Sequence, residues 1–374
     1  MELLEKGERA TLSFSSRRVV LEESIMQRDF PATAGSKILA NFIAPLNAAV
    51  VDRLNLAGLE VAGRAKMVEF GIGRISSDEP DTLSGAVEMV VQGVAEAALC
   101  NDFSGKIRRQ APEKGLCYIH PTYGTVSRYG LIPSISSMDQ IGVLCGNIRD
   151  GFDILSAISG NDPRDGAMFP EKSFSYCRKT DRIKIGVPAN VMAVTDPKTR
   201  RSAETFAARF ESESFELPFF NVYSQVMYIL GCAEISNNIN RYDGVKFGYR
   251  AENYRGLNDL YIRTRTEALG PQTKLAAIMG SMVLSKEAYT PYYEKAMKIR
   301  RLIKESTAFD RYDAVVIPSL QEADPYVQNA VYALATLAGL PAVSFPWRGS
   351  SIHLVANVKD ENTLLTAWEA ANEI

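Results

Sequence analysis

The stretch that decides the fold spans residues 101–142 and reads NDFSGKIRRQAPEKGLCYIHPTYGTVSRYGLIPSISSMDQIG. It follows residues 84–98, in which valines recur at the 3.6-residue period of an amphipathic helix. Ser84 has a residue type that suits the N-cap of this helix. Cys100 lies in an apolar context just before a loop and is predicted to be a core thiol rather than a nucleophile.

Outward from this stretch, amphipathic helices alternate with short apolar strands. Helices are predicted at residues 48–57, 84–98, 148–160, 286–304 (bent by Pro291) and 362–374. Strands are predicted at residues 59–62, 183–187, 314–317, 342–345 and 353–357. The alternation indicates an α/β fold, with a mixed, mostly parallel central sheet covered by helices on both faces. Because no linker or repeat is evident, we expect residues 1–374 to form a single domain.

Composition excludes several classes of function. The chain has 374 residues, with 42 Lys and Arg against 44 Asp and Glu, so a net charge of -2 argues against direct binding of nucleic acid. Only two histidines occur, His120 and His353, and the five cysteines show no zinc-ligand spacing, so no metal or other cofactor is expected. The N-terminus lacks the apolar run of a signal peptide, and no segment reaches the length of a membrane span. Reduced, scattered cysteines then favour a cytoplasmic location.

Five further segments accompany residues 101–142. They read SKILANFIAPLNAAVVDRLNLAG (36–58), RYDGVKFGYRAENY (241–254), RTRTEALG (263–270), YDAVVIPS (312–319) and LAGLPAVSFP (337–346). In content and order they resemble the amidase signature family, and within it the A subunits of glutamyl-tRNA(Gln)/aspartyl-tRNA(Asn) amidotransferase. The resemblance implies an amidase signature fold over nearly the whole chain. Relative to the family, the N-terminal helical region and the active-site loops are shortened.

The resemblance also assigns the family's catalytic positions. In the family a serine attacks the amide, a second serine bridges it to a lysine that acts as general base, and backbone amides of a loop stabilise the oxyanion. The family motif D-T-G-G-S-I-R matches DFSGKIR at residues 102–108, which puts Lys106 at the nucleophile. The family spacing puts Thr82 at the bridging serine, and the register of residues 36–38 puts Glu22 at the lysine.

These replacements predict that none of the three positions is catalytically functional. A carboxyl with an ordinary pKa of about 4.3 does not replace a lysine near 10.4, and a protonated lysine is a poor acyl acceptor. The matching oxyanion loop is Phe103, Ser104 and Gly105, in which Phe103 is bulkier than the family residue. We predict that Glu22 and Lys106 form a salt bridge through or near Thr82, the alternative being that both side chains point to solvent.

Substrate recognition is half retained. Arg265 matches the arginine that holds the α-carboxylate of glutamine in the family, a role that suits a guanidinium, although an ordinary helix-surface arginine is the alternative. Asn329 occupies the position of the aspartate that binds the α-ammonium, so the charge there is lost.

The sequence therefore predicts a catalytically degenerate, amidase-like protein that acts as a non-catalytic subunit or scaffold. A protein resembling the amidotransferase B subunit is the expected partner. Three alternatives stay open. One is an active glutamine-dependent amidotransferase or amidase that produces ammonia for Gln-tRNA or Asn-tRNA synthesis. Another is new chemistry at Lys106, such as Schiff-base formation, and the last is an amino-acid sensor that uses Arg265.

Overall fold

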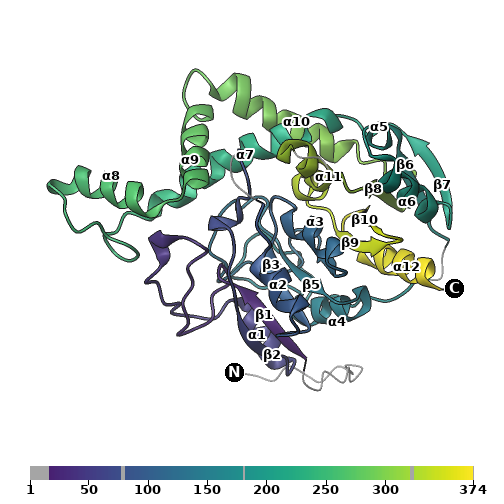
Figure 1. Cartoon of the computed structure of the whole chain (residues 1–374), viewed down its shortest axis with the longest axis horizontal. Helices are drawn as coiled ribbons and strands as arrows, with labels where there is room; N and C mark the ends of the chain where they lie inside the picture. Colours follow the sequence, from purple (N-terminus) through teal and green to yellow (C-terminus); the bar gives the residue numbers. More distant parts are fainter. Residues whose placement is uncertain (1–16, 77–80, 180–181, 321–323, 374) are drawn as a thin grey trace.

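A computed structural model describes residues 17–76, 81–179, 182–320 and 324–373. The prediction for the N-terminus falls mainly on residues 1–16, which lie outside the described part. One sheet runs through this part of the molecule in the strand order β2-β1-β3-β5-β4-β9-β10-β8-β6-β7 (Figure 1). The strands are β1 (Arg18–Glu22), β2 (Glu60–Ala65), β3 (Ala97–Asn101), β4 (Cys117–His120), β5 (Ile141–Cys145), β6 (Lys184–Pro188), β7 (Glu211–Phe215), β8 (Ala314–Pro318), β9 (Ala342–Trp347) and β10 (Ser350–Ala356).

The sheet is mixed, as predicted, but it is not mostly parallel. Parallel pairs occur towards its two ends, where β1 pairs with β2 and β3, and β6 pairs with β7 and β8. The centre is antiparallel from β3 through β5, β4, β9 and β10 to β8. Apolar strands that are buried on both faces suggested parallel pairing. Here helices cover both faces of antiparallel strands as well, which gives the same apolar pattern.

Alternating residues of each strand face two different groups of helices. On β8, Val315 and Ile317 belong to the core beneath α7 and α11, whereas Ala314 and Val316 belong to the core with α4, α6 and α12. A smaller core joins α2 and α3 to β1 and β3. The helices are α1 (Ala49–Leu56), α2 (Gly85–Val91), α3 (Lys106–Glu113), α4 (Ile148–Ile158), α5 (Ala189–Ala193), α6 (Pro197–Ala207), α7 (Tyr223–Asn238), α8 (Gly256–Ala268), α9 (Pro271–Val283), α10 (Lys295–Glu305), α11 (Pro325–Ala338) and α12 (Glu361–Asn372).

Most predicted elements are confirmed, but the helix predicted at residues 84–98 is wrong in its second half. It ends at Val91, because Gly93 takes a left-handed conformation with φ of 72° and turns the chain. The alanines that follow open β3, which is buried along its whole length between β1 and β5. Pro291, predicted to bend the later helix, lies in a π-helical turn (Tyr289–Glu294) that precedes α10, and such turns are a usual site of helix kinks.

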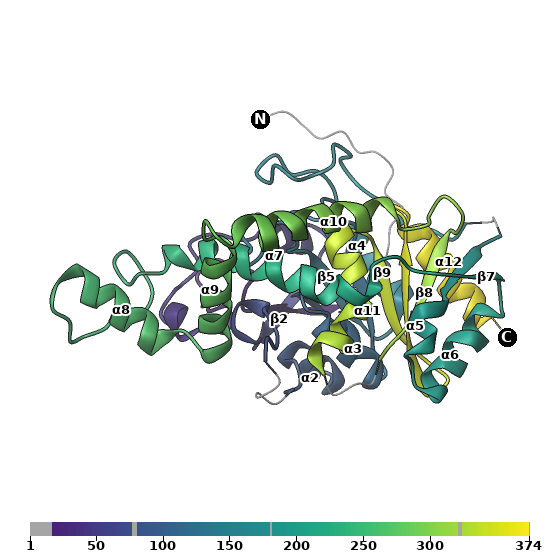
Figure 2. The same ribbon diagram turned by 90° about the horizontal axis from the view of Figure 1, so that it is seen from above.

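Helix α7 is the centre of the second layer. It packs against α9, α10 and α11, and the view from above shows α7 and α10 side by side (Figure 2). The contact with α9 is very close, because a Cβ added at Gly280 would lie 2.0 Å from the carbonyl oxygen of Cys232. Helix α8 projects away from this layer as an arm (Figure 1).

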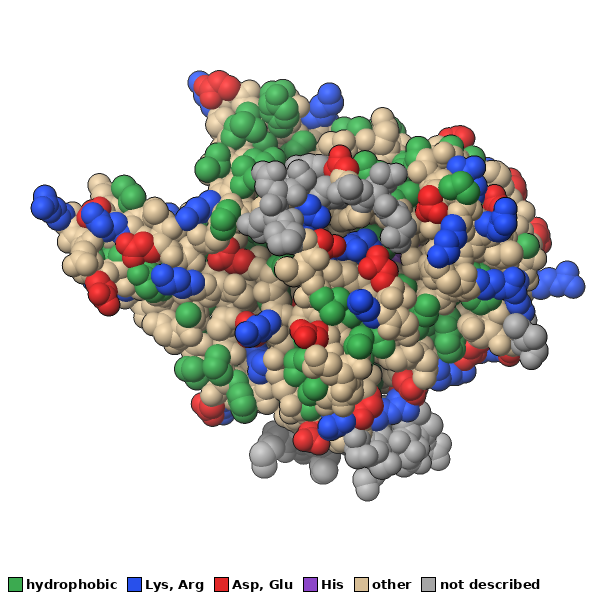
Figure 3. Space-filling view, viewed as in Figure 1, with side chains coloured by type: hydrophobic (Ala, Val, Ile, Leu, Met, Phe, Trp, Pro, Cys, Tyr) green, Lys and Arg blue, Asp and Glu red, His purple; other side chains and the backbone are tan. Residues whose placement is uncertain are grey.

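The surface mixes both signs of charge. On the face shown in Figure 3, Lys and Arg side chains are interspersed with Asp and Glu, and no broad region carries one sign. None of the helices in the described ranges combines the length and hydropathy that a membrane crossing requires.

Candidate functional site

The site is built where the parallel strands β1 and β3 end side by side. Glu22 is the last residue of β1 and Asn101 is the last residue of β3. The backbone N–H of Asn101 donates to Oε2 of Glu22 at 2.8 Å. The Asn101 side chain is held in turn by Asp139 at 2.9 Å and by the N–H of Gln140 at 3.0 Å. Carboxyl ends of parallel strands meet at one edge of a sheet, which is why residues far apart in sequence converge here.

A buried ion pair shapes the loop that leaves β3. The carboxylate of Asp102 accepts the N–H groups of Ile107 and Arg108, each at 3.0 Å, and so caps helix α3. The same carboxylate accepts Nε of Arg108 at 3.0 Å. The Arg108 guanidinium also donates to the backbone oxygen of Tyr332 and to the hydroxyl of Thr336. The loop is therefore fastened to α11 by fully buried charges that are paired and hydrogen-bonded.

The residues assigned to the oxyanion loop are packed into the core. Phe103 is buried beneath α7, edge-on to Tyr228 with ring centroids 6.3 Å apart. Gly231 leaves room for it, since a Cβ there would lie 2.7 Å from Cζ of Phe103. Gly105 has φ of 80°, and a Cβ there would lie 2.4 Å from Cβ and 2.5 Å from Cγ of Tyr332. The third residue of this loop, Ser104, is also buried.

Lys106 is the first residue of α3, and its ammonium lies beside Thr82 as predicted. Nζ donates to Oγ1 of Thr82 at 3.5 Å. The predicted salt bridge to Glu22 is wrong, however, because the ion-pair partner of Lys106 in the described residues is Asp81, with Nζ and Oδ1 3.9 Å apart. Asp81 also pairs with Arg109. The carboxylate of Asp81 is partly exposed and keeps part of its hydration when it pairs with Lys106. An ionised Glu22 would lose nearly all of its hydration, so Asp81 is the favoured partner.

Burial shifts the pKa values of Glu22 and Lys106. Glu22 is 2% exposed, and this burial raises its pKa to about 8; Asp102 adds to the rise, whereas the Asn101 N–H and Lys106 oppose it. Burial also lowers the pKa of Lys106, while Asp81 is the largest influence in the opposite direction. At neutral pH the Glu22 carboxyl therefore keeps its proton.

All three positions that the resemblance matches to the family's catalytic residues line one cavity. It has a volume of about 230 Å³, and its walls include Glu22, Thr82 and Lys106 together with Ser84 and Ser104. The sequence prediction that these positions share one site is supported by this geometry.

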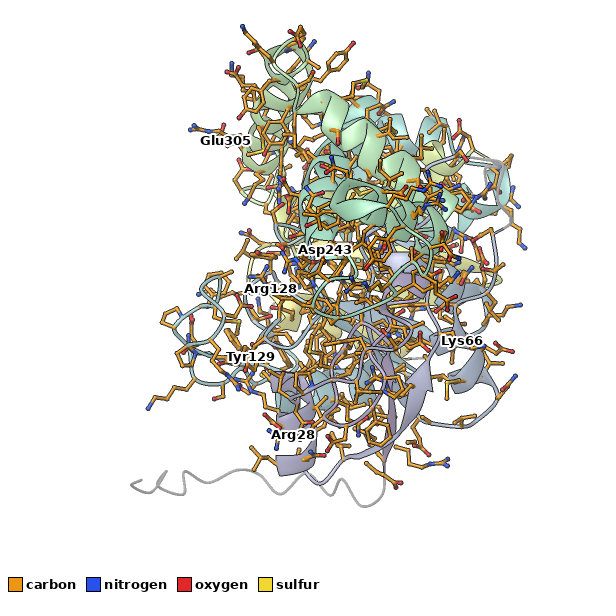
Figure 4. The ribbon with its side chains drawn as sticks, turned by 90° about the vertical axis from the view of Figure 1, so that its left-hand side faces the viewer. Arg28, Lys66, Arg128, Tyr129, Asp243 and Glu305 are labelled. Carbon is orange, nitrogen blue, oxygen red and sulfur yellow. The ribbon has the colours of Figure 1, made fainter. Side chains whose placement is uncertain are left out.

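Lys66 lies at the same cavity and is exposed. In the side view, Lys66 and Tyr129 lie on opposite sides of the body (Figure 4). Within the described ranges no group of three His, Cys, Asp or Glu side chains is arranged to hold a metal ion.

Arg265 and Asn329 do not line this cavity. Arg265, on α8, donates to the backbone oxygens of Asn240 at 2.9 Å and Tyr242 at 3.4 Å. Asn329, on α11, donates to the hydroxyl of Tyr228 at 2.5 Å. Both side chains thus have structural partners, and their predicted roles in binding an amino acid stay predictions.

Two other residues behave much as their sequence context indicated. Cys100 is buried, and burial raises the pKa of its thiol well above 9.0, which fits a core thiol. Ser84 does occupy the N-cap position of α2, but its hydroxyl makes no capping hydrogen bond. Asp81 was missed by sequence reasoning, although an acidic residue next to Thr82 offered the signal of a nearby partner for Lys106.

Comparisons with known proteins agree with this architecture. The family model described as Amidase matches residues 18–80 and 84–365. The chain is 33% identical to the A subunit of glutamyl-tRNA(Gln) amidotransferase from Lachnoclostridium phytofermentans, over 92% of this chain and 77% of that protein. It is also 33% identical to the corresponding A subunit from Coxiella burnetii, over 92% and 79% of the two chains.

Solved structures show the same similarity. The A subunit of glutamyl-tRNA(Gln) amidotransferase from Thermotoga maritima superposes with a TM-score of 0.74 at 25% identity, covering 94% of this chain and 81% of that one. The peptide amidase of Stenotrophomonas maltophilia gives a TM-score of 0.75 at 23% identity, covering 96% and 82%, and supports the fold alone.

Proposed function

Since the chain belongs to the amidase signature family and is homologous to the A subunit of glutamyl-tRNA(Gln) amidotransferase, we propose that it is a catalytically degenerate member that acts as a non-catalytic subunit or scaffold. Its partner is a cytoplasmic protein that resembles the amidotransferase B subunit. The chain itself is a single domain over residues 1–374.

The observation that carries the proposal is the position of Lys106. It occupies the first position of α3, directly after the loop whose family counterpart ends in the nucleophilic serine. Its ammonium contacts Thr82 and Asp81. An ammonium has no lone pair for attack on an amide, and an acyl group transferred to lysine would form a stable amide that does not turn over.

Glu22 supports the same conclusion. A general base must be deprotonated at the working pH, and burial raises the pKa of Glu22 to about 8. At neutral pH this carboxyl holds its proton. The Glu22 side chain is also shorter than a lysine side chain, which in the family reaches the bridging hydroxyl. The lysine–serine–serine proton transfer of the family therefore has no equivalent here.

The residues of the oxyanion loop stabilise the fold instead. Phe103 fills the core under α7, and the two free N–H groups after Lys106 are taken by Asp102. The interspersed charges of the surface in Figure 3 suit a chain that leaves tRNA contact to a partner. These features support retention of the fold for binding rather than for hydrolysis.

Release of ammonia from glutamine and asparagine by the purified full-length chain tests the loss of catalysis. We expect none above the rate without protein, whether the chain is alone or mixed with a B-like protein. A Lys114→Ala variant is the matched control, because Lys114 is an exposed lysine just after α3. Ammonia release that is lost in Lys106→Ala but kept in Lys114→Ala would overturn the proposal.

Co-expression tests the scaffold role. The tagged chain is expressed with a B-like protein from the same organism, and the mass of the purified complex is measured by light scattering. A stoichiometric complex is expected. Two separate species at micromolar concentrations would contradict the partner proposed here.

A further inference from the structure

The cavity between β1, α2 and α3 contains a hydroxyl without a partner. Ser84 is 7% exposed and lines the cavity, and its Oγ has no hydrogen-bond partner among the residues that the structure describes. Its backbone N–H is held by Gln110 at 2.9 Å, so the residue is fixed in place. A buried hydroxyl that is left without a bond loses free energy, which a ligand in the cavity would restore.

Lys106 has hydrogen-bonding capacity to spare. An ammonium offers three donors, and its two contacts in this site are long, at 3.5 Å to Thr82 and 3.9 Å to Asp81. Its side chain is only 12% exposed. The ammonium is therefore poorly hydrated and only weakly paired, and an anion that enters the cavity would bind it through charge-assisted bonds.

Glu22 completes the polar end of the cavity. Oε2 accepts the N–H of Asn101, and the raised pKa leaves a proton on the carboxyl at neutral pH, which makes it a donor to an incoming carboxylate. The nearby Asp102 carboxylate is already occupied by Ile107 and Arg108. A single ammonium, with carboxyl groups close by, suits an anion of one charge better than one of two.

The other lining residues are of mixed character: Lys66, Thr82, Glu88, Asn101 and Ser104 are polar or charged, and an apolar group accompanies them. Met67, Leu83 and Ile107 line the cavity beside the polar groups. The cavity has a volume of about 230 Å³. This is room for a short aliphatic chain.

We infer that this cavity binds a short-chain aliphatic monocarboxylate. Its oxygens accept from the Lys106 ammonium, the Ser84 hydroxyl and the Glu22 carboxyl, and its chain lies against Met67, Leu83 and Ile107. The inference deepens the proposed function, on which it rests, by naming the ligand class of the replaced site. It predicts binding without turnover.

Binding is expected to weaken with rising pH. The anion favours protonated Glu22 and charged Lys106, so affinity falls as the pH passes about 8 and Glu22 loses its proton. Other charged or titratable groups surround Glu22. They are Glu23 after β1, Lys66 after β2, Glu88 on α2, Cys100 on β3, Asp102 directly after β3 and Lys106 on α3.

The test is isothermal titration of the full chain at pH 7 with acetate, propanoate and butanoate, with propanamide as the neutral counterpart. We expect saturable binding of the carboxylates and none of the amide. Lys106→Met should weaken propanoate binding at least about tenfold, and Ser84→Ala several-fold, because each removes a donor in a poorly hydrated site. Lys114→Met, the exposed control lysine, should leave the affinity unchanged.

Three results would overturn the inference. The first is that propanoate binds the parent and Lys106→Met with equal affinity. The second is that propanamide binds as well as propanoate. The third is that titration shows no heat and ¹³C-propanoate shows no line broadening in NMR spectra. Such a failure leaves the loss of catalysis standing, whereas ammonia release overturns the proposed function whether or not carboxylates bind. A measurement at pH 9 should give weaker binding than at pH 7, and equal affinity would contradict the role of Glu22.

Discussion

The substitution Gly231→Ala tests whether the loop formed by Phe103, Ser104 and Gly105 is part of the core. In a helix interior this change usually stabilises by about 1 kcal/mol, because alanine is the better helix former. Here the new Cβ would lie 2.7 Å from Cζ of Phe103 and 3.3 Å from Cδ1 of Ile135. The Phe103 ring is buried and held edge-on to Tyr228, so it has little freedom to move away.

Overpacking of this kind typically costs about 1–3 kcal/mol. The net effect of Gly231→Ala is then a destabilisation of up to about 2 kcal/mol, opposite in sign to the propensity. In a Phe103→Leu background no atom occupies the Cζ position, and the same substitution should stabilise by about 1 kcal/mol. The two backgrounds therefore differ by a coupling energy of about 1–3 kcal/mol.

Urea unfolding of the four proteins measures this coupling, provided that the slope of the free energy of unfolding against urea is the same for all. Gly280→Ala is the matched control. Its Cβ would meet the backbone oxygen of Cys232 at 2.0 Å, so it should destabilise equally in both backgrounds. If Gly231→Ala stabilises the parent by about 1 kcal/mol with no coupling to Phe103, the described packing of the loop against α7 is refuted.

Three further predictions concern buried titratable groups and thiols. The free energy of unfolding should fall by up to about 1.4 kcal/mol per pH unit from pH 4.5 to about 8, because unfolded Glu22 releases a proton that the folded chain keeps. Glu22→Gln should remove this slope in urea titrations. An unchanged slope would count against the burial of Glu22. Burial lowers the pKa values of His120 and His353 well below 6.5, so they stay neutral in the folded chain. As the pH falls below 6.5, each buried histidine should therefore lower the free energy of unfolding by up to about 1.4 kcal/mol per pH unit. A double variant, His120→Asn with His353→Asn, that kept the whole loss of stability in acid would contradict this. Since Cys177 is exposed and the other four cysteines are buried, a thiol reagent should label one thiol of the folded chain rapidly, and rapid labelling that survives in Cys177→Ser would be the opposing result.

Helix and strand predictions succeeded where one face of an element is apolar and failed where the surroundings decide. Residues 94–98 continue the valine and alanine pattern of the helix before them, and a short apolar run fits either element. Their neighbours β1 and β5 make Ala97–Asn101 a strand. Helix α7 escaped prediction because the helices packed around it bury most of its residues, which leaves no polar face to reveal a period.

The residues of the candidate site were predicted from the sequence, but the ion-pair partner of Lys106 was not. The resemblance to the family assigned Glu22, Thr82 and Lys106 to one site, and all three line one cavity. Spacing carries no information on hydration, so the partner of Lys106 was misassigned to Glu22. The choice of Asp81 depends on how much water each carboxyl keeps after folding.

By itself, the sequence determined the family, the α/β class and the residue types at the positions matched to the family's catalytic motif, because motifs and apolar periods are local properties of the chain. Only the tertiary structure decided that the centre of the sheet is antiparallel, that Phe103 is packed under α7, and that Glu22 holds a proton beside an ammonium paired elsewhere. Strand direction, packing and pKa each depend on groups brought together from distant parts of the chain. Their free energies are set by burial, which exists only once the chain has folded.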